Sequence, residues 1–187
     1  ARMIPEDTIL ATDGGQVMEW CHSFLQPRDP HDILFVPGMG HLGFGLPMAI
    51  AAKVARPDRT VVCITGDGAM GMTCQELETA ARYGVKVITI VLNDRHWGMY
   101  RPFGELLANP NFGTKLTDVD FAKVAEGYGC RGERVTSLED LEQAFARAQD
   151  SNLPSVIDVQ VDFTPHPVDA FWPVVILRGM DLTPVEL

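Results

Sequence analysis

Two aspartates at the ends of successive apolar segments are the residues best placed to do chemistry. Asp67 follows the apolar run 60–65, and Asp94 follows the run 85–92, 27 positions further along the chain. If the runs are neighbouring parallel strands, their carboxyl ends meet at one edge of the sheet and bring the aspartates together. Two carboxylates that close repel each other unless a cation lies between them, and oxygen ligands suit Mg²⁺.

The glycines around Asp67 add a second feature to this pattern. Gly66 and Gly68 flank the aspartate, and Gly68 and Ala69 lead toward a helix expected to start near Met72. Small residues let backbone N–H groups approach a phosphate, and a helix N-terminus supplies partial positive charge. The pattern therefore predicts a Mg²⁺–diphosphate clamp. Two surface aspartates in ordinary turns are the alternative, which the pairing and the glycines disfavour.

A glycine-rich segment offers a competing interpretation. Residues 38–43 match G-x-G-x-x-G, which follows an apolar strand and opens a helix, as in dinucleotide-binding folds. Asp67 lies near the expected distance for a ribose-binding acid, although such an acid does not need two flanking glycines. A nicotinamide- or flavin-dependent oxidoreductase of the Rossmann type is therefore an alternative. A glycine turn that only lets helix and strand pack closely is another.

The elements that must position these residues alternate along the chain. Strands are expected at 8–12, 33–36, 60–65, 85–92 and 155–161, with helices up to about residue 25 and at 43–55, 72–83, 118–127 and 137–150. Asp118 and Ser137 are the predicted caps of the last two helices. Strands alternating with helices predict an α/β fold, a three-layer α/β/α sandwich with a mainly parallel sheet.

We expect one domain over residues 1–187, with two less regular parts. Residues 95–117 are rich in Gly, Pro and Asn and are predicted to form a long loop, which in compact domains is often functional. The tail 164–187 contains His166, Phe171 and Trp172, and an exposed aromatic tail of this kind would fit a subunit interface.

Composition restricts the classes of partner. The chain has 187 residues, 46% of them hydrophobic, and a formal net charge of −10, so nucleic acid and anionic membranes are disfavoured. The four cysteines form no C-x-x-C pair, which fits a reducing compartment and predicts a cytoplasmic protein. No apolar run is long enough to span a bilayer.

Taken together, the motifs resemble the thiamine-diphosphate (ThDP) enzymes of the acetolactate synthase and 2-oxoacid decarboxylase superfamily. The residues that resemble the family's GDG…NN motif are Gly66-Asp67-Gly68 and Asn93-Asp94, with "QELETA" and "HWGMYR" around them. The segment "GMGHLGFGLPMAIAA" is similar to the part that cups the cofactor rings. The resemblance covers about residues 8–175 and implies the family's diphosphate-binding domain. It also implies that the tail with His166, Phe171 and Trp172 closes over the site.

The resemblance implies roles for the residues at the end of these strands. Asp67 and Asp94 would bind Mg²⁺ through their side chains and His96 through its backbone carbonyl. The remaining diphosphate-binding residues would be Gly66, Gly68, Ala69, Asn93, Trp97 and Gly98, together with the turn Asp13, Gly14, Gly15 and Gln16. That turn is similar to the version found in acyl-CoA lyases of the family.

The resemblance also implies roles in the glycine-rich segment. Gly40 would accept a hydrogen bond from the cofactor's 4′-amino group through its carbonyl, and Gly38 would lie at the same site. Leu42 would be the apolar wedge that holds ThDP bent, and His41 would either line the substrate pocket or be an ordinary loop histidine. Acetolactate synthases have methionine as the wedge, so Leu42 favours a different activity.

Two departures from the family's pattern matter. Asp94 replaces the usual asparagine, which leaves open whether Asn93 or Asp94 faces the metal; the spacing favours Asp94. The family's catalytic glutamate lies on a pyrimidine-binding domain that precedes this one, and it would fall outside this chain. We therefore expect half of an active site, in the smaller subunit of a split enzyme or the C-terminal fragment of a cleaved one.

The predicted function is that of a ThDP- and Mg²⁺-binding subunit or fragment of a 2-oxoacid decarboxylase or carboligase. It would act on a small 2-oxoacid in a hetero-oligomer with a pyrimidine-binding chain. Within this class, sulfopyruvate-type decarboxylases are split enzymes, which the chain length suits, and a 2-hydroxyacyl-CoA lyase is the other candidate. The alternatives are the oxidoreductase above and a non-catalytic relative with the same fold.

Overall fold

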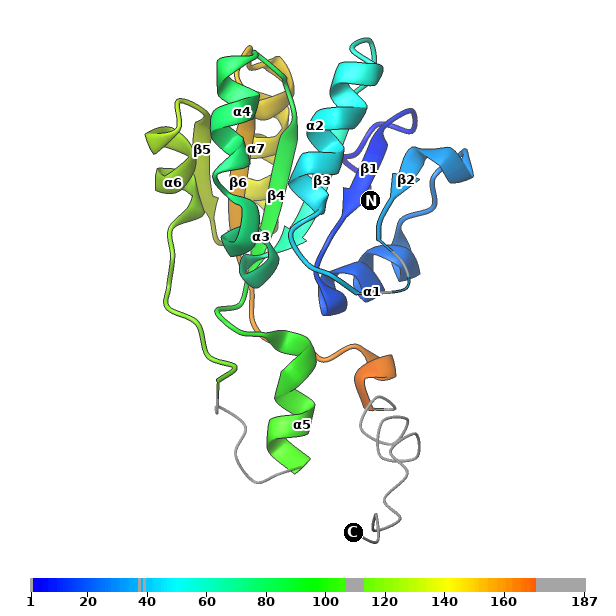
Figure 1. Ribbon diagram of the computed structural model, residues 1–187, viewed down its shortest axis with the longest axis vertical. Helices are drawn as coiled ribbons and strands as arrows, with labels where there is room; N and C mark the ends of the chain where they lie inside the picture. Colours follow the sequence, from blue (N-terminus) through cyan, green and yellow to red (C-terminus); the bar gives the residue numbers. More distant parts are fainter. Residues whose placement is uncertain (1, 37, 39, 107–112, 171–187) are drawn as a thin grey trace, which may run out of the picture.

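The computed structural model describes residues 2–36, 38, 40–106 and 113–170. Within them, the strands form one sheet in the order β2-β1-β3-β4-β6-β5, and every pairing is parallel. The strands are β1 (Ile9–Thr12), β2 (Ile33–Leu34), β3 (Val61–Gly66), β4 (Ile88–Asn93), β5 (Arg131–Val135) and β6 (Ser155–Gln160). Figure 1 shows the sheet with its helices.

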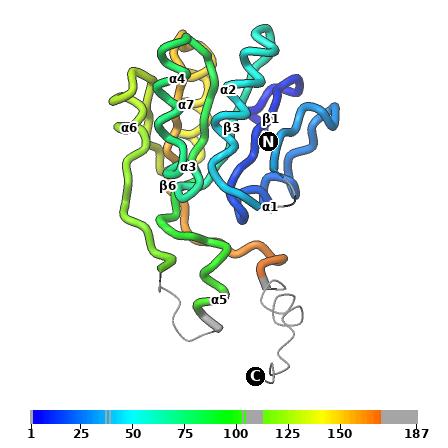
Figure 2. Tube along the Cα trace, in the orientation of Figure 1, coloured from blue at the N-terminus to red at the C-terminus, as the bar shows by residue number. Residues whose placement is uncertain are grey.

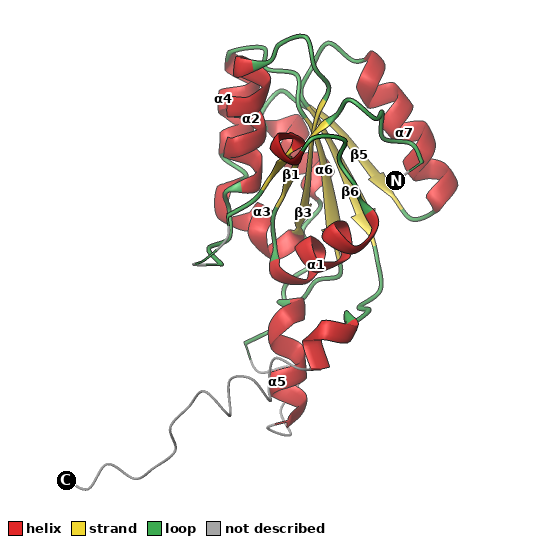
Figure 3. Cartoon of the chain, turned by 90° about the vertical axis from the view of Figure 1, so that its right-hand side faces the viewer, coloured by secondary structure: helices red, strands yellow, loops and turns green. Residues whose placement is uncertain are grey.

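Helices cover both faces of this sheet. They are α1 (Gly15–Phe24), α2 (Gly45–Ala55), α3 (Asp67–Thr73), α4 (Glu76–Arg82), α5 (Arg101–Leu106), α6 (Phe121–Gly127) and α7 (Leu138–Asp150), with single 3₁₀ turns at Pro30–Asp32, Gly98–Tyr100 and Pro167–Ala170. Figure 3 shows the sheet edge-on, between a layer with α2 and α4 and the opposite helix α7. The predicted three-layer α/β/α sandwich is confirmed.

Two apolar clusters explain the layers. Alternate strand residues such as Ala11, Cys63 and Val91 pack under α2, α4 and α6, whereas residues such as Val62 and Ile90 pack against α1 and α7. Successive side chains of a strand point to opposite faces, so a strand buried on both sides must be apolar throughout. This is why the central strands β3 and β4 are nearly continuous apolar runs.

The structure corrects several predicted boundaries. The helix predicted at 72–83 is two short helices, α3 and α4, and α3 begins at Asp67 itself. The cap of α6 is Asp120, whose Oδ1 accepts a hydrogen bond from the backbone N–H of Lys123 (3.1 Å), and not Asp118. The predicted capping of α7 by Ser137 is confirmed.

Two elements were missed. Strand β5, with the sequence RGERV, is mostly half-buried at the sheet edge. Because of its charged residues it is not an apolar run, so the sequence pattern did not predict it as a strand. Part of the predicted loop 95–117 is a 3₁₀ turn followed by α5. Figures 1 and 2 show α5 and the segment after β6 projecting beyond the same end of the sheet. No helix in the described part of the chain is long and apolar enough to cross a membrane.

A close contact at the sheet edge yields a first prediction. A Cβ on Gly132 of β5 would lie 2.0 Å from the carbonyl oxygen of Ala122 in α6. Gly132→Ala must push α6 off the sheet, and we expect a loss of about 1–3 kcal/mol or more in unfolding free energy. Gly127→Ala is the matched control, because Gly127 lies in α6 and a Cβ there would have no neighbouring atom within 4 Å. This variant should be neutral or slightly stabilising. Equal stability of the two variants in urea denaturation would contradict the observed packing.

Candidate binding site at the carboxyl edge of the sheet

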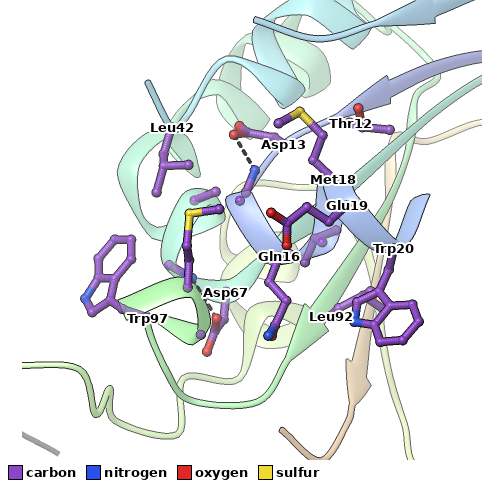
Figure 4. Close-up of a pocket in the computed structure, with 18 of the residues that line it drawn as sticks. Thr12, Asp13, Gln16, Met18, Glu19, Trp20, Leu42, Asp67, Leu92 and Trp97 are labelled. Carbon is purple, nitrogen blue, oxygen red and sulfur yellow. Dashed lines mark hydrogen bonds between the residues drawn. The ribbon is translucent and has the colours of Figure 1, made fainter. Parts of the chain in front are cut away.

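A cavity of about 790 Å³ lies at the carboxyl ends of the strands. The chain leaves β1 toward β2 on one side, while β3 and β4 continue on the other, so the strand order reverses between β1 and β3. Open α/β sheets bind their ligands at this switch point. Figure 4 shows side chains from the turn after β1, the loop before α2, the start of α3 and the segment after β4 around this cavity.

The cavity brings together sixteen of the seventeen predicted site residues, from segments far apart in the sequence. They are Asp13, Gly14, Gly15, Gln16, Gly38, Gly40, His41, Leu42, Gly66, Asp67, Gly68, Ala69, Asp94, His96, Trp97 and Gly98. Their individual roles toward a ligand stay predictions. Asn93 is the exception.

Asp67 is the buried acid of the site. The residue begins α3 directly after β3 and is only 6% exposed. Oδ1 accepts a hydrogen bond from the backbone N–H of Gly68 (2.8 Å), whereas Oδ2 is buried without a partner among the described residues. Burial, and then the charge of Asp94, raise the pKa of Asp67 to about 6. A buried carboxylate oxygen without a donor is suited to a cation.

Asp94 is the second acid. It is half-buried, and burial raises its pKa, although the backbone N–H of His96, which donates to Oδ1 (3.0 Å), partly offsets the effect. Its charge is near enough to Asp67 to raise the pKa of that residue. Like charges held together in this way need a cation or a proton.

The backbone turns sharply between these acids and the rest of the site. Arg95 has φ 61°, the only positive value of a residue other than glycine among the described residues. Such a conformation persists only where the surrounding structure enforces it. Here Leu116 donates to the Arg95 carbonyl (2.7 Å), and Trp97 donates to the Thr114 carbonyl (2.7 Å). The segment that carries Asp94 and His96 is thus fixed by the chain at 114–116, which no local signal in the sequence indicated.

Asn93 departs from the prediction. It is 1% exposed and does not line the cavity. Its Nδ2 donates to the Val119 carbonyl (3.0 Å) and to Asp158 Oδ1 on β6 (3.0 Å). Neighbouring residues at a strand end point to opposite sides, so when Asp94 faces the cavity Asn93 cannot. The role of Asn93 is to join β4 to β6.

Three glycines in the cavity wall leave no room for side chains. A Cβ on Gly68 would lie 2.6 Å from the Trp97 ring, and one on Gly15 would lie 2.7 Å from the sulfur of Met99. A Cβ on Gly98 would lie 2.6 Å from Gln16 Oε1. The turn after β4 therefore packs directly on the backbone of α1 and α3.

The segment after β6 also reaches the cavity. Gln16 Nε2 donates to Asp169 Oδ2 (2.7 Å), and Asp169 is 1% exposed. Trp20 Nε1 donates to the Thr164 carbonyl (3.2 Å), and the Trp20 ring packs edge-on against His166 at 4.6 Å. The predicted closing segment therefore contacts α1 from Thr164 to Asp169. Phe171 and Trp172 lie outside the described residues.

Several residues around the cavity were not predicted. Asp169, Trp20 and Glu19 either line it or hold a residue that does. Trp20 and Glu19 follow Gln16 by one helical turn, and that spacing was the available signal for them. Asp169 contacts Gln16 across 153 residues, and no sequence pattern indicates such a pair.

The glycine-rich segment lies on the other wall. Gly38 and Gly40 are exposed with φ of 94° and 59°, and Leu42 is half-buried at the cavity. His41 Nδ1 bonds to the Leu42 carbonyl (2.6 Å), and its ring packs edge-on against Phe44. This segment follows the edge strand β2, whereas a dinucleotide fingerprint follows the strand at the switch point. The fold thus gives the oxidoreductase interpretation no support.

A metal bound here would have fewer side-chain ligands than a metal in a site made wholly of side chains. Within the described ranges, no three or more His, Cys, Asp or Glu side chains converge as metal ligands. The pair Asp67 and Asp94 would need backbone carbonyls and ligand oxygens to complete an octahedron. This is the usual arrangement for Mg²⁺, which shares phosphate oxygens with one or two carboxylates.

Comparison with known proteins gives a consistent result. A family model described as "Thiamine pyrophosphate enzyme, C-terminal TPP binding domain" matches residues 13–159. The chain is 37% identical over 164 residues to a probable acetolactate synthase large subunit of Methanococcus aeolicus, covering 85% of this chain and 27% of that protein. It is 34% identical over 173 residues to the acetolactate synthase isozyme 2 large subunit of Escherichia coli (strain K12), covering 91% of this chain and 31% of that one.

A solved structure is similar as well. The thiamine diphosphate-dependent 4-hydroxybenzoylformate decarboxylase of Rhodococcus jostii RHA1 superposes with a TM-score of 0.81 at 34% identity, over 87% of this chain and 31% of that one. The chain spans less than a third of the length of these curated relatives.

The raised pKa of Asp67 yields a prediction for the metal-free protein. A folded-state pKa of about 6, above the unfolded value, means that this group stabilises the fold at low pH. That stability is lost as pH rises from about 4 through about 6. Asp67→Asn removes the charge, so in chelator at pH about 7.5 the variant should exceed the wild type by on the order of 1–2 kcal/mol, because solvent in the cavity screens part of the effect.

The same experiment at pH about 3.5 is the control, because below the unfolded pKa Asp67 is largely protonated in both the folded and the unfolded state and the two proteins should be similar. Added Mg²⁺ should stabilise the wild type at the higher pH and leave Asp67→Asn unchanged. Urea denaturation measures all of these values. An Asp67→Asn variant less stable than the wild type at pH about 7.5 in chelator would contradict the unfavourable effect of burial and of the Asp94 charge on ionised Asp67.

Proposed function

This chain belongs to the thiamine pyrophosphate enzymes, and we propose that it binds ThDP with Mg²⁺ as part of a 2-oxoacid decarboxylase or carboligase. The observation that supports the proposal most is the pair Asp67 and Asp94, which share a cavity at the switch point of the sheet. Their mutual repulsion needs a cation, and a cation held by only two carboxylates favours an anionic ligand beside it.

The residues present fit a magnesium ion. The unpartnered, buried Oδ2 of Asp67 is available as a ligand, and Asp94 lies at the next strand end. We propose that the backbone carbonyl of His96 is the third protein ligand. Diphosphate oxygens and water would complete the coordination, as Mg²⁺ requires.

The residues present also fit a diphosphate. Gly66, Gly68, Ala69 and Gly98 leave backbone at the cavity surface, and Gln16 offers a carboxamide from α1. Backbone N–H groups and an amide bind phosphate without adding a net positive charge. We propose that these groups hold the diphosphate beside the metal.

The opposite wall would hold the cofactor's rings. Leu42 supplies an apolar surface at the cavity, and Gly40 leaves its backbone exposed there. We propose that Leu42 packs between the two rings and that the Gly40 carbonyl accepts the hydrogen bond of the 4′-amino group. His41, at the rim, would face the substrate.

When bound, ThDP supplies the carbanion and the electron sink that decarboxylation of a 2-oxoacid requires. This chain's own residues would orient it and exclude water from the reacting centre. Asp67 and Asp94 would fix the diphosphate end, and Leu42 would fix the ring end. Trp97 and the segment after β6 would limit solvent access.

The remaining components belong to a second chain or domain. We propose a pyrimidine-binding partner that supplies the catalytic glutamate, in a cytoplasmic hetero-oligomer. The relatives named as acetolactate synthases and as a decarboxylase are more than three times as long as the stretch that they share with this chain. Leu42 in place of methionine disfavours acetolactate synthesis, and the turn Asp13–Gln16 resembles that of acyl-CoA lyases. The proposed activities are therefore a sulfopyruvate-type decarboxylase or a 2-hydroxyacyl-CoA lyase.

Calorimetric titration of ThDP, with and without Mg²⁺ and with any co-purifying chain, tests the proposal. Binding should require Mg²⁺ and should tighten with the partner. Asp67→Ala should weaken it by more than about 100-fold, because loss of even a supporting residue costs a metal site about 10–100-fold. Asp150→Ala, at the end of α7 away from the cavity, is the control and should bind as the wild type does.

Binding of NAD(H) or a flavin in place of ThDP would refute the proposal. ThDP binding with no turnover of any 2-oxoacid, even with the partner present, would identify a non-catalytic relative.

A further inference from the structure

The carboxylate of Asp13 joins two segments of the site. Asp13 follows β1 and is 6% exposed. Its Oδ2 accepts hydrogen bonds from the backbone N–H groups of Gly43 (2.9 Å) and Gly45 (2.8 Å), and Oδ1 accepts one from Gly14 (2.8 Å). One buried side chain thus connects the turn after β1 to the loop before α2, which is 30 residues away in the sequence.

The two glycine partners are shaped for this contact. A Cβ on Gly45 would lie 2.6 Å from the Cβ of Asp13 and 3.1 Å from the sulfur of Cys63. Gly43 has φ +92°, and a Cβ there would lie 2.9 Å from Thr73 Cγ2. Any other residue at either position would be strained or would displace Asp13. Asp13, Gly43 and Gly45 therefore act as one unit, which we call the Asp13 tether.

Direct contact between Asp13 and a diphosphate is unfavourable. Both oxygens already accept hydrogen bonds from backbone donors, and a carboxylate has no proton to donate to phosphate at neutral pH. Its negative charge would also repel the diphosphate in a partly buried site. The sequence-based assignment of Asp13 to diphosphate binding therefore needs a different explanation.

The tether lies immediately beside the residues of the opposite wall. Leu42 adjoins Gly43, and Gly40 lies two positions before Leu42. Leu42 and Gly40 both line the cavity. Gly38, Gly40 and His41 are exposed, so the loop has little packing of its own to fix it. The hydrogen bonds to Asp13 are its buried connections to the sheet.

We propose that Asp13 is a positioning residue that fixes the loop 40–45 so that Leu42 and Gly40 meet the cofactor's rings. This inference rests on the proposed function. The tether would act on the ring end of ThDP, whereas Asp67 and Asp94 act on the diphosphate end. Loss of the tether should therefore weaken binding of the whole cofactor but not of inorganic diphosphate with Mg²⁺.

Asp13→Asn tests this proposal. Asparagine keeps the size of the side chain but has one acceptor oxygen in place of two, so it cannot satisfy the backbone N–H of Gly14 and those of Gly43 and Gly45 together, and its NH₂ group opposes a backbone donor on one side. Calorimetry with Mg²⁺ should give a ThDP Kd raised about tenfold and a diphosphate Kd within about twofold of the wild type. Gly45→Ala, which displaces Asp13 without changing charge, should reproduce this pattern.

Two controls separate positioning from general destabilisation. Phe145→Leu leaves a gap in the core beneath α7, on the far face of the sheet, and should lower the melting temperature without changing the ratio of the two Kd values. Asp67→Asn should weaken ThDP and diphosphate together. Equal weakening of both ligands in Asp13→Asn, or no change in either, would overturn the proposal.

Amide hydrogen exchange keeps this result distinct from the proposed function. In the unliganded protein, the amides of Gly43 and Gly45 should exchange at least about tenfold faster in Asp13→Asn than in the wild type. If the wild type binds neither ligand, the proposed function fails and the ring-positioning role fails with it. Unchanged exchange at both glycines would show that Asp13 does not fix the loop, whatever the wild type binds.

Discussion

The repulsion between Asp67 and Asp94 is the constraint around which this edge of the sheet is organised. Parallel pairing of β3 and β4 places both acids at one end, and the left-handed turn at Arg95 holds the second in place. Burial raises the pKa values of both acids, so the metal-free site is electrostatically unfavourable. The apolar core on both faces of the sheet supplies the stability that lets such a site persist.

Three of the four buried aspartates in the described part of the chain show how different surroundings give one residue type different functions. Asp13 accepts from three backbone N–H groups, and Asp158 accepts from Asn93, Gln160 and the N–H of Phe121 while facing Arg134. Both are satisfied, and both hold pieces of the fold together. Asp67 has one oxygen without a donor among the described residues. Buried polar groups are normally paired, but Asp169 Oδ1 is unpaired as well, so it is the nearby charge of Asp94 that marks Asp67 as the acid that a cation would complete.

The two walls of the cavity differ in how they are held. The wall with Asp67, Asp94 and Trp97 is fixed by strand pairing and by close glycine contacts. The wall with Gly40 and Leu42 is an exposed loop connected to the sheet by one carboxylate. The first wall would hold the metal and the diphosphate rigidly, and the second, which is held separately, would contact the cofactor's rings. Relatives could then change their contacts to the rings and the substrate without disturbing the metal site. That division agrees with the similarity of this chain to proteins named for different reactions.

The sequence alone determined the α/β class, the central strands and the pair of strand-end acids, because apolar runs and glycine-flanked acids are local patterns. It also indicated both walls of the cavity, since the loops after parallel strands meet at one edge. Local patterns were insufficient where charge hid a strand, as in β5, or where two caps competed, as with Asp118 and Asp120.

Only the tertiary structure decided that Asp94 faces the cavity while Asn93 bonds to Asp158. A shift of one residue in strand register exchanges the two sides, and register depends on the neighbouring strands. Sequence patterns also could not predict the contacts of Asp13 with Gly43 and Gly45 or the contact of Gln16 with Asp169. They join residues far apart in the chain, and such contacts arise only from the packing of complete elements against one another.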